Sequence, residues 1–211
     1  MATTIPCVSQ YYLEDGVFIL KSKWNKWLRQ ITLVAATALA LSPITANNIT
    51  NITDSIELKF ATKEAALVEY IQSQNKKLST SVAYDIVKST VKWAEEFGHT
   101  PELLVAIMKQ ESNFETYAIS SAGAIGIMQV MGAVHLDKMI KAKQVVGTPE
   151  PFNVDANIYM GSMIYKKCLD NHKVDSLALK CYNGSMKINN GYEAKVLNHH
   201  KAIVNFVREN V

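Results

Sequence analysis

The chain has 211 residues, of which 48% are hydrophobic and 19% charged, and its formal net charge is +3 at pH 7. This length and composition fit one globular domain with an appendage, and they exclude collagen-like, coiled-coil and largely disordered chains. Arg29 and Arg208 are the only arginines in the sequence. We therefore expect no nucleic-acid partner, because such surfaces rely on arginine for phosphate and base contacts.

The first 46 residues predict a targeting segment. Basic residues gather between positions 21 and 29, and a run of apolar and small residues follows over 31–41. Ser42 and Pro43 break this run, and residues 44–46 offer small side chains for cleavage by signal peptidase. The order of basic, apolar and cleavable regions is that of a secretory signal.

Two interpretations of this segment stay open, a cleaved signal peptide and a retained membrane anchor through residues 31–46. The stretch before Lys21 is long for a cleaved signal, whereas the apolar run is short for a full membrane span. In both cases the positive charges before the run place the following domain outside the cytoplasm, in the periplasm or cell envelope. Four of the 22 basic and two of the 19 acidic residues lie in 1–46, which leaves 18 and 17 for a nearly neutral remainder.

The rest of the chain predicts a polar linker over residues 47–58 and one mainly α-helical domain over residues 59–211. Apolar residues recur at helical spacing, and alternating strand patterns are nearly absent. Residues 79–81 offer N-caps for one helix, and Thr100 followed by Pro101 is typical of another helix start. The predicted helices cover about residues 60–71, 82–97, 101–111, 154–169, 175–180 and 192–210.

Glu111 stands out near the end of the helix that begins at Pro101. Helical spacing places it on the same face as Leu104 and Ile107, and places Glu102 on the opposite, outer face. Burial disfavours an ionised carboxylate and raises its pKa, which suits a general acid near neutral pH. The alternative is an ordinary solvated or capping side chain at a helix end.

The glycine pair that follows, Gly123 and Gly126, predicts a tight connection, and residues 126–129 suit the start of another helix. A phosphate-binding loop is excluded because no basic residue with a following Ser or Thr comes after the glycines.

The cysteines leave two possibilities open. Cys168 and Cys181 can pair in an oxidising compartment or remain buried free thiols, and Cys7 precedes the apolar run. The spacing of cysteines and histidines predicts no metal site.

Four segments occur in an order that resembles one known family. They are Glu111-Ser112, residues 123–131 (GAIGIMQVM), residues 181–184 (CYNG) and residues 192–196 (YEAKV). Together they resemble the soluble-type (SLT-like) lytic transglycosylase family, which has the goose-type lysozyme-like helical fold. The resemblance covers about residues 80–210.

The resemblance implies a role for each matching residue, and it implies no cofactor and no metal. Glu111 matches the family's sole catalytic acid/base. The sequence departs from the family pattern at Gly132, Cys181 and Ser185, where the family often has Pro, Ala and Gly. The positions that match substrate-binding residues are Ser120, Gln129, Met131, Tyr182, Asn183 and Tyr192.

The implied activity is cleavage of the β-1,4 bond between N-acetylmuramic acid and N-acetylglucosamine in peptidoglycan glycan strands, with formation of a 1,6-anhydro product. In this interpretation Tyr182 hydrogen-bonds to Glu111, and Gln129 and Asn183 hold the sugar.

The candidates for a second catalytic carboxylate are Glu115, Asp137 and Asp155, and the sequence assigns that role to none of them. One alternative is a hydrolytic muramidase that uses water with help from Asp137 or Asp155. Another is a non-catalytic wall-binding module.

Overall fold

The computed structural model describes residues 11–14, 17–20 and 62–211, within two compact units, Met1–Ser55 and Ile56–Val211. The described part of the first unit is an antiparallel hairpin of β1 (Tyr11–Glu14) and β2 (Val17–Leu20). The apolar run and the polar linker predicted from the sequence lie outside the described residues. Among the helices that are described, none is long and apolar enough to cross a membrane.

The second unit is mainly helical, as predicted from the sequence. Two very short strands, β3 (Ala124–Ile125) and β4 (Val130–Met131), pair as an antiparallel hairpin. The helices are one over residues 62–74, then α3 (Thr80–Phe97), α4 (Pro101–Ser112), α5 (Leu136–Val145), α6 (Val154–His172), α7 (Asp175–Tyr182) and α8 (Tyr192–Glu209).

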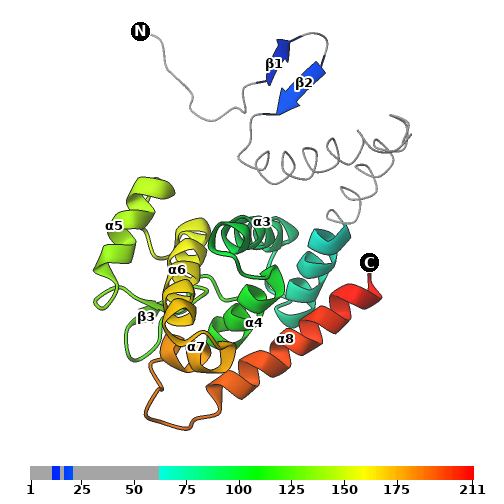
Figure 1. Ribbon diagram of the computed structural model, residues 1–211. Helices are drawn as coiled ribbons and strands as arrows, with labels where there is room; N and C mark the ends of the chain where they lie inside the picture. Colours follow the sequence, from blue (N-terminus) through cyan, green and yellow to red (C-terminus); the bar gives the residue numbers. More distant parts are fainter. Residues whose placement is uncertain (1–10, 15–16, 21–61) are drawn as a thin grey trace, which may run out of the picture. The chain divides into compact units, whose positions relative to one another are not determined.

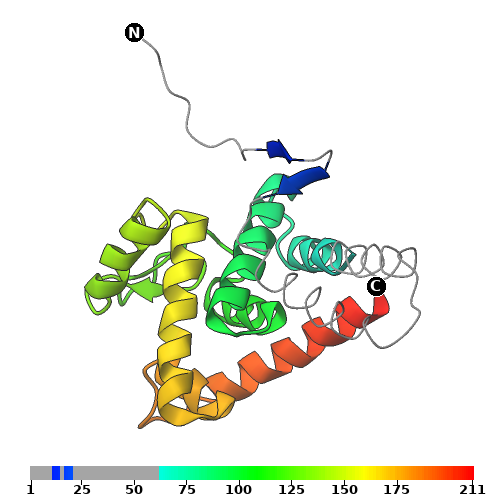
Figure 2. The same cartoon turned by 45° about the horizontal axis from the view of Figure 1, so that its top comes forward.

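Helix α4 lies at the centre of this unit (Figure 1). The long helix α8 packs along it, and α3 packs against both α4 and α6 (Figures 1 and 2). The short α7 fills the corner between α6 and α8. This packing brings the C-terminal end of α4 close to the start of α8.

Helix boundaries agree with the capping residues in the sequence. The hydroxyl of Ser79 accepts a hydrogen bond from the N–H of Val82 at the start of α3, and Gly98 ends that helix in the left-handed conformation. Pro101 occupies the first position of α4, although Thr100 makes no side-chain cap there. The predicted helix starts are therefore confirmed at α3 and α4.

The prediction that Glu102 lies on an outer face of α4 is wrong. Glu102 is 7% exposed and its carboxylate contacts the ammonium group of Lys63 at 2.7 Å. All residues from 102 to 108 are buried, so neighbouring elements surround this helix instead of covering one stripe. A partner charge on the 62–74 helix makes this burial of a carboxylate tolerable.

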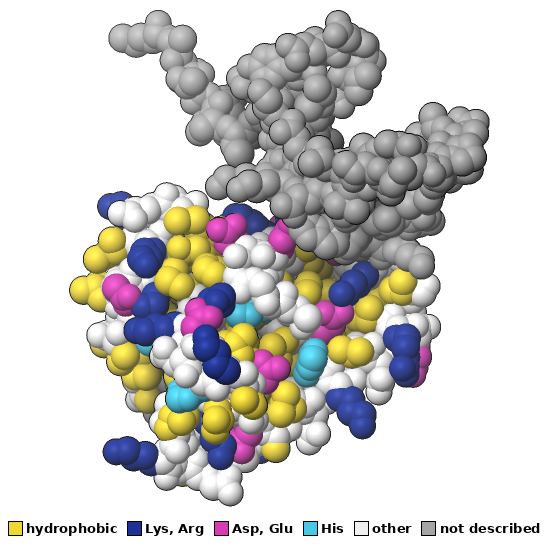
Figure 3. Space-filling view, in the orientation of Figure 1, with side chains coloured by type: hydrophobic (Ala, Val, Ile, Leu, Met, Phe, Trp, Pro, Cys, Tyr) yellow, Lys and Arg dark blue, Asp and Glu magenta, His cyan; other side chains and the backbone are white. Residues whose placement is uncertain are grey.

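The region after α4 also differs from the prediction. Residues 126–129 do not begin a helix; they form the turn between β3 and β4, and the backbone of Gln129 has a φ of 49°. Helix α5 was not predicted, because Leu136 is 63% exposed while Lys138 is buried. On the face of the molecule in Figure 3, hydrophobic and basic side chains lie next to each other over α5.

Helix α6 is confirmed, and Gly161 in its middle packs closely against the β3–β4 turn. A Cβ atom at Gly161 would lie 2.8 Å from the Cβ of Met128. The absence of a side chain therefore lets the β3–β4 turn approach the middle of α6.

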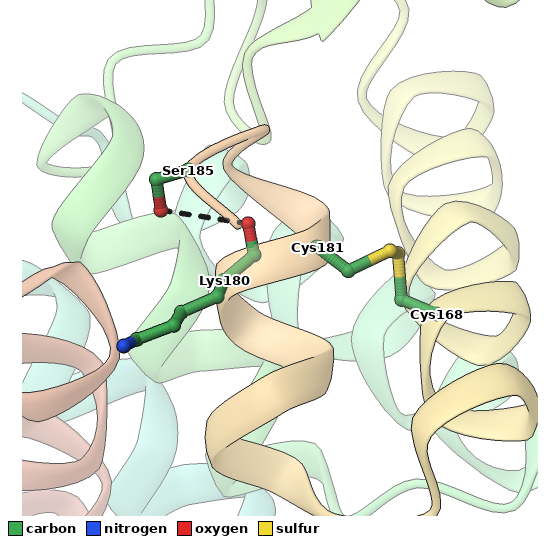
Figure 4. Close-up of a disulfide and its surroundings, with 4 residues drawn as sticks. All are labelled: Cys168, Lys180, Cys181 and Ser185. Atoms are coloured by element: carbon green, nitrogen blue, oxygen red, sulfur yellow. Dashed lines mark hydrogen bonds between the residues drawn. A yellow bond between two sulfur atoms is a disulfide. The ribbon is translucent and has the colours of Figure 1, made fainter. Parts of the chain in front are cut away.

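A disulfide joins α6 to the last turn of α7 (Figure 4). It pairs Cys168 with Cys181, whose Cα atoms are 5.7 Å apart. The structure thus favours pairing over free thiols.

Candidate active site

Glu111 lies in the last turn of α4, where its carboxyl group meets the first residue of α8. The hydroxyl of Tyr192 donates a hydrogen bond of 2.5 Å to Oε1 of Glu111. Burial raises the pKa of Glu111 to about 7, and the hydrogen bond from Tyr192 acts in the opposite direction. Near neutral pH such a carboxyl group is partly protonated, so it can either donate or accept a proton.

The backbone turns sharply two residues after Glu111, directly after the end of α4. Asn113 and Phe114 both have positive φ values, 51° and 66°, although neither is glycine. Phe114 is fully buried and its ring meets that of Tyr70 edge-on, so core packing fixes this unfavourable conformation. Backbone strain of this kind is often concentrated at functional sites.

The β3–β4 turn is fastened next to Glu111 by side chains bonded to its backbone. The Ser112 hydroxyl donates to the carbonyl of Ile127 at 2.8 Å. The side chain of Asn157 on α6 accepts from the N–H of Met128 and donates to the carbonyl of Ile125, at 2.8 and 3.0 Å. These contacts set the position of the turn without long strands.

Tyr182 lies near Glu111 but does not hydrogen-bond to it, which corrects the prediction. Its hydroxyl donates to the carbonyl of Met128 at 2.7 Å. Burial and the charge of Glu111 both raise the pKa of Tyr182. The tyrosine that contacts Glu111 is Tyr192, and Tyr182 instead holds the β3–β4 turn.

The other predicted substrate-binding residues surround this turn or lie at the end of α7. The Gln129 amide donates to the carbonyl of Gly126 at 2.9 Å, and the Ser120 hydroxyl accepts from the N–H of Ala124 at 3.0 Å. Met131 is partly exposed on β4. Asn183 is exposed and its side-chain carbonyl accepts from Asn190 at 3.0 Å.

The candidate second carboxylates are engaged elsewhere or face solvent. Asp155 contacts Lys92 at 3.1 Å and accepts from the indole of Trp93 at 2.6 Å. Asp137 pairs with its neighbour Lys138, and Glu115 is exposed. Within the described part of the chain, burial and Tyr192 account for the pKa of Glu111 without a second carboxylate.

Comparison with known proteins identifies the domain. The model of the transglycosylase SLT domain matches residues 88–204, which is more than half of the chain. The chain belongs to the transglycosylase SLT domain family. The matched residues of the SLT domain run from α3 into α8 and include Glu111, the β3–β4 turn and both tyrosines.

Curated relatives match a part of this chain. Two of them, both named membrane-bound lytic murein transglycosylase C, are from Actinobacillus pleuropneumoniae and Edwardsiella ictaluri. That of Actinobacillus pleuropneumoniae serotype 5b is 36% identical over 75 residues, 34% of this chain and 20% of the relative. That of Edwardsiella ictaluri is 36% identical over 72 residues, 33% of this chain and 20% of the relative. The match therefore spans about a fifth of each relative's length.

Sequence reasoning missed Asn157, which is 1% exposed and fixes the β3–β4 turn of the SLT domain. Its amide also donates to the carbonyl of Pro151 at 2.7 Å. The sequence signal for this role was an amide among the apolar residues of α6. A buried amide must find hydrogen-bond partners, so such a residue indicates a structural contact.

The raised pKa of Glu111 predicts a pH-dependent effect of Glu111→Gln on stability. The folded chain binds the proton more tightly than the unfolded chain, so this contribution is full below pH 4.5 and is lost as pH rises through about 7. From pH 4 to pH 8 the variant should gain roughly 3 kcal/mol in unfolding free energy relative to the parent, as an upper bound. Urea unfolding at both pH values measures this.

The matched control is Glu115→Gln, an exposed glutamate four positions later. Its stability relative to the parent should not change between the two pH values. A constant difference for Glu111→Gln would show that the carboxyl of Glu111 is hydrated and not buried.

Proposed function

We propose that this chain is a peptidoglycan lytic transglycosylase that uses Glu111 as its single general acid/base. Its reaction cleaves the β-1,4 bond between N-acetylmuramic acid and N-acetylglucosamine and leaves a 1,6-anhydro end on the muramic acid. The observation that carries the proposal is a carboxyl group with a pKa of about 7, bonded to Tyr192, in an SLT domain. The name of the relatives, membrane-bound lytic murein transglycosylase C, supports the same substrate.

The first step is protonation of the glycosidic oxygen by the neutral carboxyl of Glu111. The bond from C1 of the muramic acid to that oxygen breaks, and the N-acetylglucosamine leaves as an alcohol. The acetamido group of the muramic acid stabilises the positive centre at C1. Ser120, Gln129, Met131 and Asn183 are the proposed glycan contacts that hold the sugars in place.

In the second step the Glu111 carboxylate removes the proton of the C6 hydroxyl. The C6 oxygen then bonds to C1 and closes the anhydro ring, which returns Glu111 to its neutral form. Because the nucleophile belongs to the same sugar, its effective concentration is high and no water has to be positioned. Tyr192 favours the carboxylate form that this step requires.

The hydrolytic alternative needs a group that activates water, usually a second carboxylate. Asp155 is engaged with Lys92 and Trp93, and Asp137 is solvent-exposed. These contacts favour the internal C6 hydroxyl over water as the nucleophile.

Glu111→Gln should lower the rate of peptidoglycan cleavage by about 10²-fold or more, because the amide cannot donate or accept the proton. Glu115→Gln is the matched control and should keep parental activity. Mass spectrometry of the parental products should show anhydro ends. Reducing ends would establish a muramidase instead, and intact glycan would indicate a wall-binding module.

Tyr192→Phe should lower activity about 10-fold and move the alkaline limb of the pH profile to higher pH. Loss of a hydrogen bond to the carboxylate raises the pKa of Glu111 further. Tyr165→Phe is the control, because its hydroxyl donates to Asp175 and not to Glu111. Equal midpoints in both variants would contradict this role of Tyr192.

We further propose that residues 1–46 export the domain, as a signal peptide or as a membrane anchor through residues 31–46, with 47–58 as linker and 59–211 as the enzyme domain. The Cys168–Cys181 disulfide supports an oxidising compartment. Alkaline phosphatase fused after residue 58 should be active in bacteria, and removal of residues 31–41 should abolish that activity. An active fusion without the run would refute the proposal.

A further inference from the structure

The disulfide adjoins the residues around Glu111. Cys181 is followed directly by Tyr182, whose hydroxyl donates to the carbonyl of Met128 in the β3–β4 turn. Cys168 is 6% exposed on α6, a long helix that packs in the core. The bond therefore fastens the last turn of α7 to a rigid helix, one residue before a side chain that holds the turn.

Helix α7 is held in place mainly by tertiary contacts. It has only eight residues, and its N-cap residue Val174 makes no side-chain cap. A helix of this length is not stable by itself in water. Its C-terminal position consequently depends on its neighbours α6 and α8, and the disulfide supplies a covalent link to α6.

The same end of α7 also bears on Tyr192. The ammonium group of Lys180 contacts the carboxylate of Glu193 at 3.3 Å, next to Tyr192 at the start of α8. Ser185 folds back on α7, where its N–H donates to the carbonyl of Lys180 at 2.9 Å. Its hydroxyl donates to the same carbonyl, and Figure 4 shows this contact beside the disulfide. Residues 180–182 thus include Tyr182 and contact Glu193, the neighbour of Tyr192.

The connection between α7 and α8 adds no regular structure of its own. Gly184 and Gly191, near its two ends, have positive φ values of 70° and 67°. Met186 and Ile188 on this connection are 46% and 64% exposed. The position of Tyr192 relative to α7 is therefore set mainly by the packing of α7 and α8.

We propose that the Cys168–Cys181 disulfide is a positioning element of the active site, which holds Tyr182 and Tyr192 around Glu111 and keeps water from its carboxyl group. This inference rests on the proposed function of Glu111. Without the bond, the last turn of α7 moves away from α6, Tyr182 loses Met128, and the carboxyl group of Glu111 becomes hydrated. The chain is then fully active only in its disulfide form.

The test compares Cys168→Ala/Cys181→Ala with its parent, both as full chains carrying Cys7→Ser. Activity on solubilised peptidoglycan is measured from pH 5 to pH 9 well below the unfolding temperature. We expect kcat to fall roughly 10-fold, since a displacement of about 1 Å at a catalytic site costs up to about 10²-fold. The alkaline midpoint should move to lower pH, because burial is the larger effect on the pKa of Glu111 and its loss outweighs a weakened hydrogen bond from Tyr192.

Loss of stability alone is controlled by Ile86→Ala, which opens a cavity in α3 and touches none of the contacts described above. This variant should keep the parental midpoint. Dithiothreitol, which converts the disulfide to two thiols, should reproduce the change in the parent and leave the double variant unaffected. A double variant with the parental midpoint and kcat within about 2-fold of the parent would overturn the inference.

A second readout does not depend on activity. The pH-dependent stability difference between Glu111 and Glu111→Gln, measured with and without the disulfide, reports burial of the carboxyl directly. A smaller difference without the disulfide supports the positioning role even if Glu111→Gln proves active, in which case only the proposed function fails. An unchanged difference refutes the positioning role even if Glu111→Gln is inactive.

Discussion

The hydrogen bond between Tyr192 and Glu111 joins two residues that are 81 positions apart, and the fold of the domain makes this contact. Burial favours the neutral acid, whereas the tyrosine favours the carboxylate. Burial is the larger of the two effects, and together they leave the pKa of Glu111 at about 7. Helices α4 and α8 must therefore pack closely along their length and also meet at their ends.

The β3–β4 turn next to Glu111 is held by side chains that bond to its backbone. Ser112, Asn157 and Tyr182 come from α4, α6 and α7, and each binds a backbone group between Ile125 and Met128. A turn held at both sides by short strands of two residues has few hydrogen bonds of its own. Buried polar groups that satisfy its backbone define one position for it.

Local signals allowed the sequence to predict most of the fold, whereas the site required tertiary information. Ser79, Gly98 and Pro101 mark helix ends through contacts within a few residues, so α3 and α4 were predictable. Helix α5 was not, because its exposed Leu136 and buried Lys138 reverse the usual pattern. The sequence also indicated Glu111 and two tyrosines, but which tyrosine bonds to Glu111 depends on how α7 and α8 pack.

A single carboxyl group with a pKa of about 7 suits a reaction in which the same group first donates and then accepts a proton. A much higher pKa would weaken it as a base in the second step, and a much lower one would leave it ionised before the first. Hydrolysis adds the separate task of activating water. Of the candidate carboxylates, Asp155 is held by Lys92 and Trp93, and Asp137 and Glu115 are exposed to solvent. The proposed internal attack removes this task and places the whole demand on the environment of Glu111. In this proposal the rate depends on burial of Glu111, on Tyr192 and on the elements that position them, and so also on the disulfide one residue from Tyr182.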